Sequence, residues 1–311
     1  MLVLDAHCDT ASALLDQKAD LYENNCQIDL KRLLAAGERI QFFASFSNPF
    51  KFRNSSLIRI LSIIDYVYRA QELYSDKMSV CLNLRDINDA ITCGKVGVIL
   101  SVEGGDALNS ELCILRQLYR LGVRSMLLTW NHRNMLADGS LETHGAGLSD
   151  FGSQVVAEMN RLGMIIDVSH LCEASFRDVL ELSTAPVIAS HSNAKSVCGH
   201  PRNLSDEQLI NLKSKGGVVG ITFYPFFLNN SENASIDDVI RHIEHICSII
   251  GEDNIGIGSD FDGIECVPEG LEGSQSLSVL FEKLLTLNYS ESFIEKFAGL
   301  NFMRVIRQIL Q

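Results

Sequence analysis

The sequence predicts an α/β fold, a (β/α)8 barrel, on three observations. Eight short apolar runs recur along the 311 residues. Stretches with the 3.6-residue period of amphipathic helices lie between them, and no Pro/Gly/Ser-rich linker interrupts the alternation. Eight strand-and-helix units in a chain of this length fit one closed barrel, with an open doubly wound sheet as the second choice. We therefore expect residues 1–311 to form a single barrel domain.

The predicted strands are apolar almost to their ends, as parallel strands are when helices cover both faces of the sheet. In order they are LVLDAH (2–7), IQFFASF (40–46), VGVILSVEGG (96–105), VRSMLLTW (123–130), GMIIDVSH (163–170), APVIASHS (185–192), GGVVGITFY (216–224) and NIGIGSDFDG (254–263). The helices predicted between them include 56–74, 110–122, 149–163, 205–216 and 235–251, and a terminal amphipathic helix is predicted over 291–311. Several begin at Ser and end at Gly, which favour helix caps.

Composition excludes several classes of partner. The net charge of −13 argues against nucleic acid or an anionic membrane as the main partner, because both need basic patches. No apolar run reaches the roughly 18 residues that span a bilayer. The first predicted strand begins at once, so we expect no signal peptide and a cytoplasmic location. Nine cysteines without a CxxC pair favour reduced, buried thiols, and a small molecule is the expected ligand.

Ionisable residues follow the predicted strands at their carboxyl ends. They are His7 and Asp9, Glu103, His170, His191 with Arg202 beyond it, Tyr224, and Asp260. Because the carboxyl ends of parallel strands share one rim of a barrel, where active sites lie, these residues should converge. Singly, each histidine fits a hydrogen-bonded core residue, and Glu103 fits a salt bridge. As a set, three imidazoles and two carboxylates favour a pair of divalent ions, zinc first, with manganese, cobalt and iron open.

Two ions that share a water can lower its pKa and polarise a carbonyl oxygen, which is the chemistry of a hydrolase. Their four positive charges, less Asp9, Glu103 and a hydroxide, leave about +1, which Asp260 cancels. A substrate carboxylate would then need its own cation, and Arg202 offers a planar guanidinium group that can bind a carboxylate through two hydrogen bonds. Asp260 beside a metal-bound hydroxide is placed to pass a proton to a leaving amine.

Eight motifs carry a resemblance to a known family. In order they are DAHCDT, SVEGGDAL, LTWNHRNMLADG, GLSDFG, DVSH, SHSNAKSVCGHPRN, GITFY and GIGSDFDG, and they cover most of the chain. Together they resemble the membrane (renal) dipeptidase family of binuclear zinc peptidases, in a soluble, bacterial-type form. The resemblance implies a TIM-type barrel of the metal-dependent hydrolase kind, two divalent ions with Zn²⁺ expected, cleavage of L-Xaa-L-Xaa and L-Xaa-D-Xaa dipeptides, and frequent homodimers.

The resemblance also implies a role for each site residue. His7 and Asp9 would hold one ion, Glu103 would bridge, His170 and His191 would hold the other ion, Asp260 would be the acid/base, Arg202 would take the dipeptide's carboxylate, and Tyr224 would lie by the reacting amide. One position departs from the pattern. Mammalian-type members carry a substrate-binding histidine directly after the Leu-Thr of the fourth strand, where this chain has Trp130. We take His132 as the candidate for that contact, with Trp130 as the alternative.

The sequence therefore favours a dinuclear metallodipeptidase in which a hydroxide bridging two ions attacks the peptide carbonyl and Asp260 protonates the amine. One alternative is another metal-dependent barrel amidohydrolase acting on a non-peptide amide. The other is a catalytically inactive binding homologue, although such a protein would be expected to lack a ligand, and all five positions and Asp260 are present. Counting bound metals and assaying dipeptides separates the three.

Overall fold

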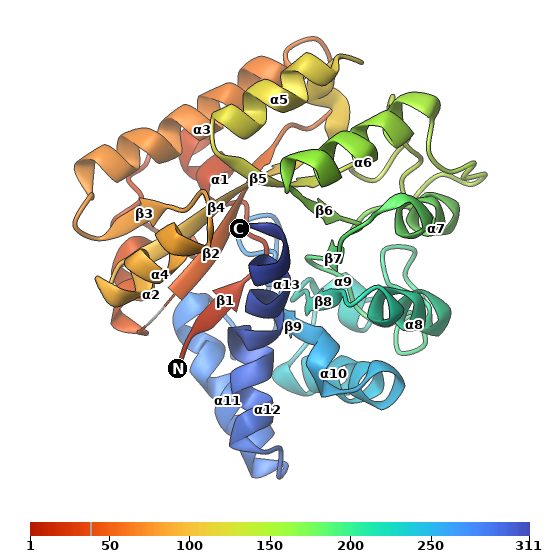
Figure 1. Cartoon of the computed structure of the whole chain (residues 1–311). Helices are drawn as coiled ribbons and strands as arrows, with labels where there is room; N and C mark the ends of the chain where they lie inside the picture. Colours follow the sequence, from red (N-terminus) through yellow and green to blue (C-terminus); the bar gives the residue numbers. More distant parts are fainter. Residues whose placement is uncertain (38) are drawn as a thin grey trace.

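The computed structural model describes residues 1–37 and 39–311, and eight of its strands close into a parallel barrel (Figure 1). These are β1 (Val3–Asp5), β2 (Arg39–Phe46), β4 (Val96–Glu103), β5 (Val123–Leu127), β6 (Ile165–Asp167), β7 (Ile188–Ala189), β8 (Val218–Ile221) and β9 (Ile255–Ile257). They follow the order β2-β1-β9-β8-β7-β6-β5-β4, and β2 pairs with β4 to close the ring. The predicted barrel is confirmed, each predicted run overlaps one of its strands, and the open sheet is wrong.

A further strand, β3 (Met78–Val80), was not predicted. It pairs with the first residues of β4, from Val96 to Val98, whereas β5 pairs with β4 from Leu100 onward. The strand β3 therefore lies outside the closed ring, beside the amino end of β4. Three residues are too few to produce a recognisable alternation of polar and apolar side chains, so β3 could not be recognised from its sequence pattern.

Helices surround the barrel (Figure 1). They are α1 (Thr10–Gln17), α2 (Leu30–Ala35), α3 (Ser56–Leu73), α4 (Leu84–Thr92), α5 (Leu112–Arg120), α6 (Asp150–Leu162), α7 (Glu173–Leu182), α8 (Asp206–Ser214), α9 (Pro225–Leu228), α10 (Ile236–Ile250), α11 (Leu277–Thr286), α12 (Glu291–Glu295) and α13 (Asn301–Ile309). The five interior helices predicted from periodicity correspond to α3, α5, α6, α8 and α10. Their caps explain their ends: the Ser149 and Ser205 side chains accept backbone hydrogen bonds at the starts of α6 and α8, and Gly163 ends α6 at a φ of 70°.

The predicted terminal helix is α12 and α13, joined by a π-helical turn at Lys296–Leu300. One face of α13 packs against residues near the amino ends of the barrel strands. This buried cluster includes Leu4, Ile40, Phe42, Ile165, Ile188 and Val218 from the strands and Phe302, Val305, Ile306 and Ile309 from α13. In Figure 1, α13 lies over the centre of the ring of strands. Because α13 covers the amino end of the barrel, the carboxyl end is left for a functional site.

All nine cysteines are free thiols. Within residues 1–37 and 39–311, the helices include none with both the length and the apolar character that crossing a bilayer requires.

Candidate metal centre and active site

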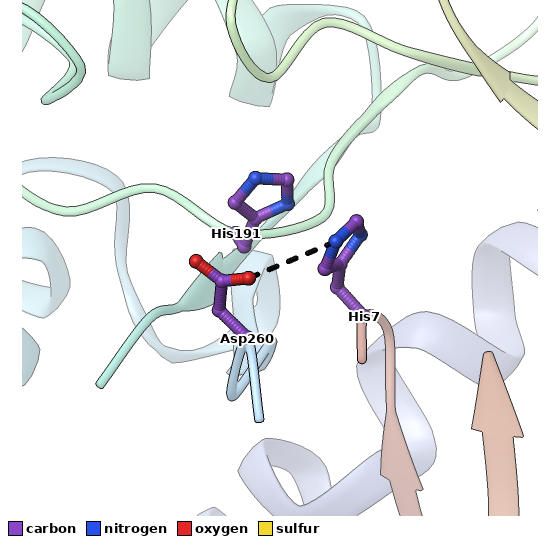
Figure 2. Close-up of side chains that lie close together, drawn as sticks. All are labelled: His7, His191 and Asp260. Carbon is purple, nitrogen blue, oxygen red and sulfur yellow. Dashed lines mark ion pairs between the residues drawn. The ribbon is translucent and has the colours of Figure 1, made fainter. Parts of the chain in front are cut away.

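Ionisable side chains from five strand ends meet at the carboxyl end of the barrel. They come from His7 and Asp9 after β1, Glu103 at the end of β4, His170 after β6, His191 after β7 and Asp260 after β9. The donor atoms form three overlapping groups, in each of which all atoms lie within 4.8 Å of one another: His7, Asp9 and Glu103; Glu103, His170 and His191; and His7, His191 and Asp260. Figure 2 shows the third group, with the His7 and His191 rings and the Asp260 carboxylate converging.

Glu103 lies between the first two groups and offers one oxygen to each. Its Oε2 is 3.4 Å from Nε2 of His7, and its Oε1 is 3.0 Å from Nε2 of His170. His7 Nε2 is in turn 3.5 Å from Oδ2 of Asp9, and His170 Nε2 is 2.8 Å from Nε2 of His191. The structure therefore brings together all five residues that the sequence proposed as ligands, in the two sets proposed, with Glu103 common to both.

The residues fit divalent cations on an observation independent of the family. Among the described residues, both ring nitrogens of His7 and Oδ1 of Asp9 are buried without a hydrogen-bond partner. Leaving buried polar atoms unpaired costs on the order of 1–3 kcal/mol each, so a site that does so needs another partner for them. Imidazole nitrogens and carboxylate oxygens, without thiolate, suit zinc and the harder transition-metal ions.

The protonation of the cluster shows the same need for positive charge. Burial opposes a charge on His7, but the nearby carboxylates of Asp9 and Glu103 raise the pKa of His7 well above its ordinary value. Burial raises the pKa of Asp9 to about 6 and that of Asp260 well above the ordinary range. Burial also lowers the pKa of His170 to about 3. Divalent cations would compete with protons for these donor atoms.

Two of the site residues adopt a backbone conformation that side chains disfavour. His170 has a φ of 71° and Asp260 a φ of 64°. Such left-handed conformations cost on the order of 1 kcal/mol and persist where the surroundings fix them, often at functional sites. The carbonyl of His170 accepts a hydrogen bond of 2.7 Å from the amide of Ser140, and the amide of Asp260 donates to the carbonyl of His7 at 3.1 Å. The barrel loops therefore hold these residues in place.

Hydrogen bonds orient two of the histidine rings, through residues that the sequence analysis missed. Nδ1 of His170 lies 2.8 Å from Oδ1 of Asn131, and Nδ1 of His191 lies 2.9 Å from Oγ of Ser190. Because Oδ1 of Asn131 only accepts, His170 carries its proton on Nδ1 and presents the Nε2 lone pair to the cluster. Asn131 stands in the motif LTWNHRN, but only the fold shows that this motif reaches His170.

Two buried carboxylates, also missed, tie neighbouring strand ends together. Asp5 of β1 accepts hydrogen bonds from the amide and hydroxyl of Ser259, at 2.9 and 2.6 Å, next to Asp260. Asp167 of β6 accepts a 3.0 Å hydrogen bond from the amide of Ser190, next to His191. Both acids stand two or three residues before a site histidine, in DAH and DVSH, and that recurrence is the signal that could have found them.

A cavity of about 440 Å³ opens above the cluster. Its walls include Asp9, Glu103, His170, His191 and Asp260, together with Arg202, Tyr224, Phe46 and Trp130. Arg202 is buried, its Nη2 donates to the carbonyl of His191 at 3.2 Å, and within the described part of the chain its Nε has no partner. Burial lowers the pKa of Arg202 to about 10, so it stays charged near neutral pH. The cavity thus offers one buried cation beside the acidic cluster.

The structure separates the two candidates for the position after the fourth predicted strand. Trp130 lines the cavity, whereas His132 is absent from its walls as described. Nδ1 of His132 lies 3.6 Å from Oε1 of Glu142, and its side chain is 43% exposed. Thr129 and Asn131 face His170, and Trp130, between them, faces the cavity. Asn131 also lines the cavity, and residues 130–132 form a bend rather than an extended strand, so His132 does not share the cavity position of Trp130.

A parallel barrel whose carboxyl rim carries a buried set of imidazole and carboxylate donors is the architecture of metal-dependent barrel hydrolases. Comparison with known proteins identifies the group within that class. The family model of the membrane dipeptidases, peptidase family M19, matches residues 1–311. The chain belongs to this family and is a dipeptidase of the metallopeptidase class.

Individual relatives agree with that assignment. The dipeptidase tcpJ of Claviceps purpurea is 34% identical over 293 residues, which cover 91% of this chain and 69% of the fungal protein. A metallopeptidase from Rhodobacter sphaeroides, solved with a phosphinate mimic of L-Ala-D-Ala, is 27% identical, with a TM-score of 0.92 and 99% of both chains covered. The dipeptidase AC of family M19 is 28% identical, with a TM-score of 0.93, covering 100% of this chain and 99% of that one.

Proposed function

We propose that this chain hydrolyses L-Xaa-L-Xaa and L-Xaa-D-Xaa dipeptides with two divalent ions, zinc in the first place. The observation that carries the proposal is the position of Glu103, whose two carboxylate oxygens face two separate groups of donors. A single-ion site would not need one carboxylate shared in this way. The phosphinate mimic of L-Ala-D-Ala bound to the Rhodobacter sphaeroides relative supports the choice of substrate.

His7 and Asp9 would hold one ion, His170 and His191 the other, and Glu103 both. When bound, the two ions would lower the pKa of a water molecule and polarise the scissile carbonyl. The protein's own contribution is to fix the ligands: Asn131 and Ser190 set the orientation of His170 and His191.

Arg202 and Asp260 would act on the dipeptide directly. The buried guanidinium of Arg202 would bind the C-terminal carboxylate, because an unpaired charge at this depth gains most from an ionic partner. Oδ1 of Asp260 lies 3.8 Å from Nε2 of His7, at the edge of the cluster. From there the Asp260 carboxylate would take the proton of the attacking water and pass it to the nitrogen of the leaving amine. Tyr224 lines the same cavity and would lie beside the reacting amide.

The first experiment is to purify the protein, count its bound metals, and assay L,L and L,D dipeptides alongside an N-acyl amino acid. Two ions per chain with chelator-sensitive dipeptide cleavage is the expected result. Cleavage of the N-acyl amino acid alone would favour a barrel amidohydrolase for non-peptide amides. Bound ions without turnover of any substrate would favour an inactive binding homologue and would overturn the proposal.

Replacing Asn131 with Ala is expected to weaken metal binding by about 10–100-fold, because the His170 ring loses the acceptor that fixes its tautomer and orientation. Competition with a chromophoric chelator would measure the dissociation constants. Asn131→Asp is the matched control, since it keeps an acceptor oxygen at the same place and should restore most of the affinity. Equal metal affinity in wild type and Asn131→Ala would show that Asn131 does not position His170.

A further inference from the structure

Three aromatic side chains on one side of the cavity have no part in the mechanism above. We call Phe46, Phe50 and Trp130 the aromatic shelf. The ring centroids of Phe46 and Trp130 are 5.4 Å apart, and the Phe50 ring stands edge-on to Trp130 at 6.5 Å. Phe46 and Trp130 line the cavity, and Phe50 stands behind them, 66% exposed. A cluster of large apolar rings open to solvent next to an acidic metal-ligand set calls for a ligand that covers it.

The shelf stands directly above the carboxylate shared by the two donor groups. In the barrel, Phe46 of β2 is paired with Glu103 of β4, and Glu103 is paired on its other side with Leu127 of β5. Trp130 follows Leu127 by three residues. The rings of Phe46 and Trp130 therefore meet across the end of β4, on the two sides of Glu103. A substrate bond held over Glu103 would have its nearest side chain against these rings.

The barrel order decides which end of a dipeptide meets the shelf. Arg202 lies beyond β7, and β2, which carries Phe46, is four strands from β7 in either direction around the ring. The two strands are thus on opposite sides of the cavity. On that side of the cavity, the guanidinium of Arg202 lies over the ring of Phe227, 5.4 Å from the ring centroid. With the C-terminal carboxylate on Arg202 and the scissile amide over the cluster, the N-terminal residue extends toward β2, β4 and β5.

We propose that the aromatic shelf is the subsite for the side chain of the substrate's N-terminal residue and that it selects large apolar or aromatic side chains there. The inference rests on the proposed dipeptidase function and adds the chemical class of substrate. The rings of Phe46 and Trp130 offer a substrate side chain apolar contact rather than an ionic partner, and Arg59 on the cavity wall is already paired with Asp16 at 2.6 Å. Trp130 is the specificity-determining residue, since it brings the largest ring to the cavity wall.

Kinetics with matched dipeptides test the proposal. The selectivity ratio is kcat/KM for L-Phe-L-Ala divided by that for L-Ala-L-Ala, and it should be about tenfold or more in the wild type. Trp130→Ala should reduce this ratio by about tenfold, with Trp130→Leu giving a partial loss. The reversed substrate L-Ala-L-Phe carries its ring on the C-terminal residue, away from the shelf. The ratio of kcat/KM for L-Ala-L-Phe to that for L-Ala-L-Ala should therefore change by less than about threefold in Trp130→Ala.

Phe52→Ala is the matched control variant. Phe52 is an aromatic residue that lines the same cavity but lies next to Lys51 and Arg59 rather than in the shelf. This variant should leave the selectivity ratio within about threefold of the wild-type value. A wild-type ratio near one, or an equal loss in Trp130→Ala for L-Phe-L-Ala and L-Ala-L-Phe, would overturn the proposal.

A second measurement needs no variant, because Trp130 is the single tryptophan of the chain and its fluorescence reports only on the shelf. A phosphinate dipeptide mimic with a phenylalanine side chain at the N-terminal position should shift the emission to the blue, since the ring displaces water from the indole. The alanine mimic should shift it less. An equal shift with both, or a larger one with the ring at the C-terminal position, would overturn the assignment.

The two proposals fail differently. If no dipeptide is cleaved but the N-terminal phenylalanine mimic shifts Trp130 emission and binds more tightly than the alanine mimic, the proposed catalysis is wrong and the shelf is still the N-terminal subsite. If dipeptides are cleaved without any N-terminal preference and without an emission shift, the peptidase function stands and the shelf proposal is wrong.

Discussion

Replacing Asp260 with Asn is expected to lower kcat for dipeptide hydrolysis by about 10²–10⁴-fold while the number of bound metal ions is unchanged. Asparagine has nearly the same shape as aspartate but cannot take up a proton from water and return it to an amine. The fold should tolerate the change, because position 260 has a φ of 64° and Asn adopts this conformation more readily than most residues. Steady-state kinetics and elemental analysis of the same preparation would measure both quantities.

Asp262→Asn is the matched control for this prediction. Asp262 lies two residues further along the same loop and also has a positive φ, 66°. Its carboxylate accepts hydrogen bonds of 2.6 Å from the Thr10 hydroxyl and from the amide of Gln27, which is a structural link between the loop and the start of α1. The control should lose thermal stability with a change in kcat of less than about tenfold. Full kcat in Asp260→Asn would mean that another group moves the proton.

The barrel and the convergence of its polar strand ends could be predicted because both follow from the direction of the strands. Each strand of the closed ring is a short apolar run that becomes polar at its carboxyl end, and the barrel brings such ends to one rim. Glu103 illustrates the inference: seven buried strand residues lead to a carboxylate that needs a partner, and the structure gives it two histidines. The parallel direction of the strands is enough to predict that the side chains at their carboxyl ends lie close together.

The supporting contacts could not be predicted because they depend on strand register. Asp5 meets Ser259 because β1 pairs with β9, and Asn131 meets His170 because β5 lies beside β6. A one-residue shift in either pairing would turn these side chains away, and the sequence does not state the register. The same limit applies to Trp130 and His132. They are two residues apart, and the sequence does not show the path of the loop that decides which of them faces the cavity.

Removal of the metal ions with a chelator is expected to abolish dipeptide hydrolysis and to lower the Tm. At free metal about 1,000-fold above the dissociation constant, binding to one site stabilises the folded state by about 4 kcal/mol, which for a chain of this size is on the order of 10 °C. The effect should be large because the metal-free cluster leaves His7 and Asp9 with buried, unpaired polar atoms within the described residues. Differential scanning calorimetry with and without chelator measures it.

The Tm loss on chelation should grow as the pH rises from about 6.5 to about 8.5, because ligand deprotonation and metal binding are linked. In the metal-free protein the pKa of His7 is raised by Asp9 and Glu103 against the effect of burial, so its stabilising contribution is present below its unfolded pKa and is lost as pH rises through the folded value. Burial raises the pKa of Asp260, so ionising it in the folded state costs stability as pH increases. Burial lowers the pKa of His170 to about 3, so this residue affects stability only below its unfolded pKa. It therefore contributes no pH dependence between about 6.5 and 8.5.

Bound ions would remove this dependence, since they would take the place of the protons on the carboxylates and His7. The metal-loaded protein should therefore keep its Tm over the same pH range in which the metal-free protein loses stability. Glu103→Gln provides the control: with one shared oxygen changed to an amide, it should bind the ions weakly and show little difference in Tm with and without chelator at either pH. A Tm difference in the wild type that shrinks toward high pH would contradict the coupling between protons and metal at this cluster.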